Sequence, residues 1–201
     1  IYISFSGEIF DPHNGFRDLL NRKVKFIGEP NTRIIEDNLR ILRFLRFSVS
    51  YANEIDKTAY QACRNNIKKI RKLSYTRRLE EVKKIIILTN FKSFLKKLDN
   101  LFLKEIFEID IYTKNFGRLN DIEILTSSVS SIRRLKFFFQ KKLSNNRFLE
   151  ALAKSDAKRI KAHISLKEYK LKTIRKKLFL YGKTNLIDQI FFDYTNNKID
   201  F

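Results

Sequence analysis

The helical character of this chain is clearest in residues 33–47, RIIEDNLRILRFLRF. Ile34, Ile41 and Leu45 recur with the spacing of a helix that packs one face against a core. Four charged residues follow the other side of the same helix at steps of three: Asp37, Arg40, Arg43 and Arg46. Because Phe44 interrupts that side, we expect one continuous helix that is buried on two faces and whose charged ribbon lines a cleft.

Two interpretations of this charged ribbon are open. Asp and Arg three positions apart on a helix often form a solvated ion pair worth only about 0.3 kcal/mol. Arginines that alternate with large apolar residues are instead typical of an enclosed site that holds an anionic or planar group. The Leu and Phe residues between the arginines favour the second interpretation.

The composition predicts a mostly α-helical, basic protein. Among 201 residues there are five Gly and two Pro, and only Gly117 and Gly182 follow Pro30. The formal net charge of +20 favours a polyanionic partner, of which nucleic acid is the usual one. A single cysteine, Cys63, cannot form an internal disulfide, which indicates a reducing cytoplasm. No apolar run reaches membrane-spanning length and the two histidines lie far apart, so we expect neither a membrane partner nor a metal site.

The chain is expected to begin with a small β-structure. Apolar and polar residues alternate in residues 1–10 around Ser-Gly, which predicts a β-hairpin. The sequence DPHNG at residues 11–15 has strong turn chemistry. Apolar residues at 24–27 predict a further short strand, and Asn31 or Thr32 can cap the helix that follows.

Three segments together resemble the central block of the class II RNA nucleotidyltransferases, which include the CCA-adding tRNA nucleotidyltransferases and the bacterial poly(A) polymerases. These segments are DPHNGFRDL at 11–19, VKFIGEP at 24–30 and RIIEDNLRILRFLRF at 33–47. LSYTRRLEEVKKII at 73–86 is similar to the next helical motif of the family. Arg77 and Glu81 match that motif, whereas Arg78 departs from it.

The resemblance implies that Asp37 and Arg40 select the base of an incoming CTP or ATP, with Arg43 and Arg46 in the same nucleotide pocket. Cytosine and adenine both present an amine beside a ring nitrogen, so a carboxylate can accept from the amine while an arginine donates to the nitrogen. Guanine and uracil place a carbonyl where the amine would be, which leaves the carboxylate unpaired. Supporting roles are expected for three further residues: Glu36, Arg77 and Glu81.

Family members also carry a glycine-rich strand with a DxD pair that binds two Mg²⁺ ions, and this sequence has no such motif. Phosphoryl transfer in the family needs these metal-bridged carboxylates. Asp121 and Glu123 have the spacing of a carboxylate pair but lack the glycine-rich context. We therefore expect no catalytic residue and no metal site in this chain, and no catalysis by the chain alone. A separately encoded palm domain is one partner that would complete it.

Basic residues recur at helical spacing in the last third of the chain, and the resemblance implies that they bind tRNA or another RNA 3′ end. The residues expected to contact RNA are Arg133, Arg134, Lys158, Arg159, Arg175 and Lys176. A solvated lysine face is the alternative for any one of these runs. The phenylalanines at 137–139 are expected in the core.

We thus expect a mostly α-helical fold with a small β-hairpin at the start. The expected parts are a palm remnant at 1–28, a neck with the nucleotide-base-recognition helices at 29–90, a helical body at 91–130 and an RNA-binding helical tail at 131–201. A family member would add CMP or AMP to RNA 3′ ends, either for tRNA CCA addition or for poly(A) tailing. A non-catalytic RNA-binding module and a degenerate gene remnant are the alternatives.

Overall fold

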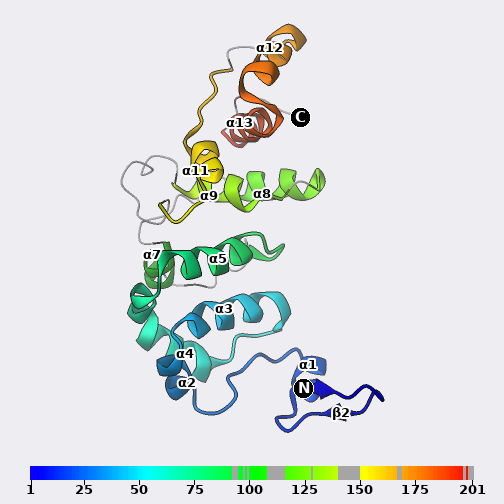
Figure 1. The fold of residues 1–201 in the computed structure, drawn as a ribbon, viewed down its shortest axis with the longest axis vertical. Coiled ribbons are helices and arrows are strands. Elements are labelled where there is room, and N and C mark those ends of the chain that lie inside the picture. Colours follow the sequence, from blue (N-terminus) through cyan, green and yellow to red (C-terminus); the bar gives the residue numbers. More distant parts are fainter. Residues whose placement is uncertain are drawn as a thin grey trace. The chain divides into compact units, whose positions relative to one another are not determined.

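The computed structural model is mostly helical with a small antiparallel β-hairpin, which confirms the expected fold class (Figure 1). It describes residues 1–91, 95–96, 98, 100–107, 116–127, 129–139, 150–166, 169–196 and 198. Within these ranges no helix combines the length and the apolar character that a bilayer crossing requires. The chain divides into two compact units, Ile1–Glu108 and Ile109–Phe201.

The predicted hairpin is confirmed, since β1 (Tyr2–Ile3) pairs antiparallel with β2 (Ile9–Phe10). The turn between them uses Gly7, whose φ of 87° is a left-handed value that glycine adopts without strain. All four strand residues are exposed. The hairpin therefore adds little to the core of the first unit.

The further strand predicted at residues 24–27 is wrong, because these residues pair with no strand in the described part of the chain. They follow α1 (Gly15–Leu20) in an irregular segment. Its Phe26 ring stacks on Phe44 with ring centroids 5.3 Å apart. Side-chain packing rather than a backbone ladder therefore holds this segment in place.

The expectation of one continuous helix over residues 33–47 is also wrong. α2 (Pro30–Glu36) ends at Asp37, which has extended backbone angles, and α3 (Leu39–Tyr51) begins two residues later. The Asp37 carboxylate accepts a hydrogen bond from the backbone N–H of Leu39 at 3.0 Å. Asp side chains compete in this way for backbone groups, which favours helix ends over helix interiors. The break therefore separates Asp37 from the arginines of α3.

The start of α2 differs from the prediction as well, since Glu29 and not Asn31 or Thr32 caps it. The Glu29 carboxylate accepts from the backbone N–H of Thr32 at 2.6 Å, and Pro30 occupies the first helical position. Proline suits that position because its missing N–H would have no helical partner there. These backbone hydrogen bonds also hold the pKa of Glu29 below its usual value.

In the first unit, α4 (Lys57–Asn66) packs on α2, and α5 (Tyr75–Ile86) packs on α3. α7 (Asn100–Phe107) packs on the 3-10 helix η1 (Ile67–Lys72). The apolar residues enclosed between these helices include Ile34, Ile41, Leu42, Leu45, Val82 and Phe102. Cys63 on α4 is buried among them, and burial raises the pKa of its thiol to about 12.

The regular elements among the described residues of the second unit are all helices. It consists of α8 (Phe116–Leu125), α9 (Ser131–Phe139), α11 (Lys154–Lys161), α12 (Leu171–Tyr181) and α13 (Lys183–Thr195). α13 packs on α8 and α12, and α9 packs on α11. The expected core positions are confirmed at residues 137 and 138, which are buried, whereas the side chain of residue 139 lies outside the described part.

A buried ion-pair network joins four helices of this unit, α8, α9, α11 and α13. Arg133 donates to Glu123 and to Asp188, with an N–O distance of 2.9 Å in each case. Arg134 pairs with Glu123 at 2.6 Å, and Arg159 pairs with Asp188 at 2.7 Å. Both carboxylates are fully enclosed, so the arginines provide the hydrogen bonds and the opposite charge that replace water around them.

We predict that Asp188→Asn destabilises the second unit by about 3 kcal/mol, because it leaves Arg133 and Arg159 without their shared buried carboxylate. Urea unfolding followed by far-ultraviolet circular dichroism measures the change. Asp121→Asn is the matched control, since that side chain is exposed on α8 and its replacement should cost less than about 0.5 kcal/mol. Equal stability of the two variants would contradict a structural role for the network.

Candidate functional site

A cavity of about 230 Å³ lies beside α3 in the first unit. Three arginines and a lysine share its wall with apolar and aromatic side chains: Val24, Lys25, Phe26, Ile27, Arg33, Arg40, Arg43, Phe44 and Phe47. This combination suits a ligand that has both a flat apolar part and negative charge.

The spacing on α3 explains why charged and aromatic residues meet at this cavity. Arg40, Phe44 and Phe47 are four and then three positions apart, so successive turns place them on one side of the helix. Phe44 is buried under the Phe26 ring, whereas Phe47 is 38% exposed. A partly exposed ring beside guanidinium groups offers a stacking surface for a planar ligand.

Arg40 is held in place from α2. Its Nη1 donates to the backbone carbonyl of Arg33 at 2.8 Å and to the carboxylate of Glu36. The hydrogen bond from Arg40 lowers the pKa of Glu36, partial burial opposes that shift, and the charge of Arg33 adds to it. In the part of the chain that the structure describes, Nε and Nη2 of Arg40 have no hydrogen-bond partner, so these donors remain available to a ligand.

Asp37 pairs with α5 and not with Arg40. Nη2 of Arg77 lies 3.0 Å and 3.2 Å from the two Asp37 carboxylate oxygens. With the bond from the N–H of Leu39, three of the roughly four acceptor positions of a carboxylate are occupied. Asp37 does not line the cavity itself. A ligand that reaches Asp37 could use only the one acceptor position of the carboxylate that remains unoccupied.

Arg43 and Arg46 point to different surroundings. Arg46 is largely buried, donates to Glu81 of α5 at 2.9 Å and lies over the Phe47 ring. Arg43 is about half exposed, lies 3.9 Å from Glu81 and lines the cavity. The structure therefore brings Arg40 and Arg43 to the cavity and places Arg46 in the contact between α3 and α5.

The carboxylates near this cavity do not fit a Mg²⁺ site. Glu36 is occupied by Arg33 and Arg40, and Asp37 is occupied by Arg77. Over the ranges that the structure describes, no group of three or more His, Cys, Asp or Glu is placed to hold a metal ion. In the second unit Glu123 is buried with two arginines while Asp121 is exposed, so this spacing does not form a carboxylate pair either.

The residues expected to contact RNA fall into two groups. Arg133 and Arg134 are buried in the ion-pair network, and Arg159 joins it from α11, so their guanidinium groups serve the core. The remaining three are exposed: Lys158, Arg175 and Lys176. Sequence reasoning missed Phe179, which is 90% exposed three positions after Lys176 on α12. The signal was its spacing from Lys172, Arg175 and Lys176, which puts an aromatic ring in a basic stripe.

No protein-family model matches the chain. The chain is similar to the human mitochondrial CCA tRNA nucleotidyltransferase 1, with 39% identity over 90 residues, which are 43% of this chain and 21% of the human protein. It is 34% identical over 101 residues to the CCA-adding enzyme of Staphylococcus epidermidis, covering 50% of this chain and 25% of that enzyme. The CCA-adding enzyme of Streptococcus thermophilus is 32% identical over 93 residues, 46% of this chain and 23% of that enzyme. The matched stretch thus spans about a fifth to a quarter of each relative.

We predict that Glu81→Gln destabilises the first unit at pH 7 by about 2 kcal/mol, because the largely buried Arg46 then loses the carboxylate with which it pairs. Burial acts to raise the pKa of Glu81, but hydrogen bonds from Lys84 and Arg46 outweigh it and lower the pKa below the usual 4.5. The stabilisation is therefore complete above about pH 4.5 and is lost as the pH falls through the lower folded value.

Urea unfolding of the wild type and the variant at pH 7 and at pH 3 measures this dependence. The difference between them should shrink at pH 3. The exposed neighbour Glu80, replaced as Glu80→Gln, is the control and should show little change at either pH. A Glu81→Gln effect that is the same at both pH values would contradict the assigned pairing.

Proposed function

We propose that this chain, which is related in sequence to the CCA-adding nucleotidyltransferases, binds the incoming CTP or ATP of tRNA 3′-terminal CCA addition at the cavity beside Arg40 and Arg43. The observation that carries the proposal is the pair of guanidinium groups beside a partly exposed aromatic wall. The relatives' names refer to CCA addition, which favours that activity over poly(A) tailing.

Base selection follows from the donors and acceptors that remain available. Nε and Nη2 of Arg40 can donate to the ring nitrogen that cytosine and adenine share, and the last acceptor position of Asp37 can receive the exocyclic amine. Arg77 holds the Asp37 carboxylate, and Glu36 holds the Arg40 guanidinium, so neither group has to be ordered by the nucleotide. Arg43 lies 3.9 Å from Glu81 and is about half exposed, so its guanidinium can also contact the nucleotide.

We propose that the metal-binding carboxylates of the reaction come from a palm domain, which is either part of the same polypeptide or separately encoded. The acidic residues around the cavity are occupied by arginines and do not suit Mg²⁺. On this proposal the 201-residue chain alone does not transfer nucleotides.

The RNA partner is proposed to lie along α12. None of its residues is buried, and Lys172, Arg175 and Lys176 give it a basic face. Together with the net charge of +20, this favours contact with RNA phosphates, which for the proposed activity belong to tRNA. The same face also favours the second candidate function, a non-catalytic RNA-binding module.

We predict that the purified chain binds CTP and ATP about tenfold more tightly than UTP and GTP, because a carbonyl in place of the amine sets an acceptor against the remaining acceptor position of Asp37. Arg43→Ala should weaken CTP and ATP binding by about tenfold. Equilibrium dialysis with each labelled nucleotide measures both effects. Arg17→Ala is the control, since this exposed arginine of α1 does not line the cavity.

Equal binding of all four nucleotides, or none, would contradict the proposed function and leave the RNA-binding module. Addition of a purified palm fragment from a related CCA-adding enzyme separates the two further. Incorporation of labelled CMP and AMP into tRNA, absent with either piece alone and lost with Arg43→Ala, is the result that the nucleotidyltransferase proposal requires.

A further inference from the structure

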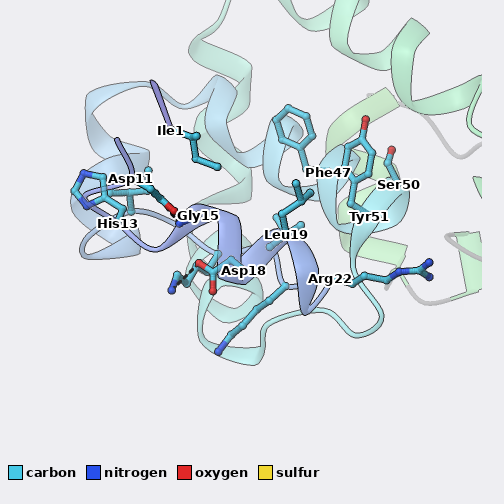
Figure 2. A pocket seen from close by; sticks show the side chains of 14 residues that line it. Ile1, Asp11, His13, Gly15, Asp18, Leu19, Arg22, Phe47, Ser50 and Tyr51 are labelled. Carbon is cyan, nitrogen blue, oxygen red and sulfur yellow. Dashed lines mark hydrogen bonds and ion pairs between the residues drawn. The ribbon is translucent and has the colours of Figure 1, made fainter. Parts of the chain in front are cut away.

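A second hollow, of about 630 Å³, adjoins the nucleotide cavity (Figure 2). The two share Val24, Lys25, Ile27 and Phe47 as lining residues, so they are neighbours on either side of one wall. A volume of this size is within the range of small-molecule sites in proteins. Nothing in the proposed binding of CTP or ATP uses it.

The lining of this hollow combines apolar side chains and aromatic rings with two carboxylates, Asp11 and Asp18, and with basic residues. Leu19 and Val24 are among the apolar residues. Phe47 and Tyr51 lie on successive turns of α3 with ring centroids 6.0 Å apart, and both are exposed enough to meet a ligand. Lys25 is neutralised by Asp18 at 2.7 Å and thus contributes little net charge. These features suit a planar ring that carries a phosphate.

Asp11 of the lining accepts from backbone N–H groups, so the net positive charge comes from Lys23 and from Arg22, which has an unusual backbone conformation. The backbone N–H of Arg22 bonds to the carbonyl of Leu19 at 3.0 Å, and that of Lys23 bonds to the carbonyl of Asp18 at 2.8 Å. This pair of bonds forms a Schellman motif that ends α1, with Arg22 at its left-handed residue and a φ of 49°. Glycine is the usual residue at that position because it has no Cβ to cause strain.

The side chain of Arg22 is not explained by the fold. No hydrogen-bond or ion-pair partner for its guanidinium lies among the residues that the structure describes. Figure 2 shows it at the same end of the hollow as Tyr51 and directed away from Asp18. A guanidinium at a backbone position that favours glycine therefore lies at the same end of the hollow as an exposed aromatic ring.

We propose that this hollow holds the 3′-terminal nucleoside of the RNA acceptor, with its base against Tyr51 and its phosphate at Arg22. The inference rests on the proposed function, because an acceptor end must lie next to the incoming nucleotide to react with it. The shared wall at Phe47 provides that proximity. Arg22 at the rim receives the phosphate from which the rest of the RNA strand leads away.

The substitution Arg22→Gly tests this directly, because it removes the cation and suits the left-handed backbone. We expect the melting temperature of the chain to stay the same or rise, while binding of a single-stranded RNA with a 3′-terminal 2-aminopurine weakens by about five- to tenfold. Arg17→Ala removes the same charge from α1 outside the hollow and should change binding by less than about twofold.

A second variant addresses the stacking surface. Tyr51→Ala should reduce the quenching of the 3′-terminal 2-aminopurine and weaken binding by about five- to tenfold. Phe5→Ala is its control, since that ring is fully exposed on the hairpin turn. When 2-aminopurine is instead placed at the 5′ end of the RNA, the wild type should quench it no more than the Tyr51→Ala variant does.

The outcomes separate this inference from the function on which it rests. If Arg22→Gly and Tyr51→Ala bind the 3′-terminal probe as the wild type does, while Arg43→Ala still weakens ATP binding, the inference is wrong and the proposed function stands. Equal quenching of the 5′ and 3′ probes would also overturn it. So would a result in which Arg22→Gly weakens the binding of AMP but leaves the binding of RNA unchanged. If Arg43→Ala leaves ATP binding unchanged, the proposed function itself fails.

Discussion

The packing of α3 on α5 is the contact on which the candidate site depends. At one end of the contact the buried Glu81 carboxylate of α5 holds Arg46, and at the other end Arg77 of α5 holds Asp37. The packing of these two helices thus fixes the Asp37 carboxylate and also the direction of the α3 surface that carries Arg40. Arginines held by carboxylates from other elements keep their remaining donors directed at the cavity, which lowers the entropy lost when a ligand binds.

The elements of the first unit were predictable where local pattern and tertiary contacts agree. Apolar periodicity indicated helix in residues 33–47, the family motif indicated the helix at 73–86, and alternation around Gly7 located the hairpin. The break at Asp37 was not predictable from periodicity, because the apolar spacing continues across it while the side chain captures the N–H of Leu39. The failed strand at residues 24–27 has the reverse cause, since its β-pattern is genuine but no strand pairs with it among the residues that the structure describes.

Charge was the least predictable part of the second unit and of the site. Arg133 and Arg134 look like a surface run, yet Glu123 and Asp188, from two other helices, draw them into the core. Their pairing depends on how the helices pack, which no local pattern contains. For the same reason the choice of residues around Arg40 and Asp37 was predictable from a family motif, whereas the partner of each was not. The special position of Arg22 was not predictable from the sequence, because it depends on a left-handed backbone angle at a residue that is not glycine.

The enclosure of Cys63 has a practical chemical consequence. It is the chain's only cysteine, and at neutral pH its thiol stays protonated inside the helical core, where alkylating and oxidising reagents meet no thiolate. The native cysteine is therefore not expected to react with thiol-directed labels. A cysteine introduced at any exposed position becomes the single reactive handle for a fluorophore or a spin label, with no native residue to remove first.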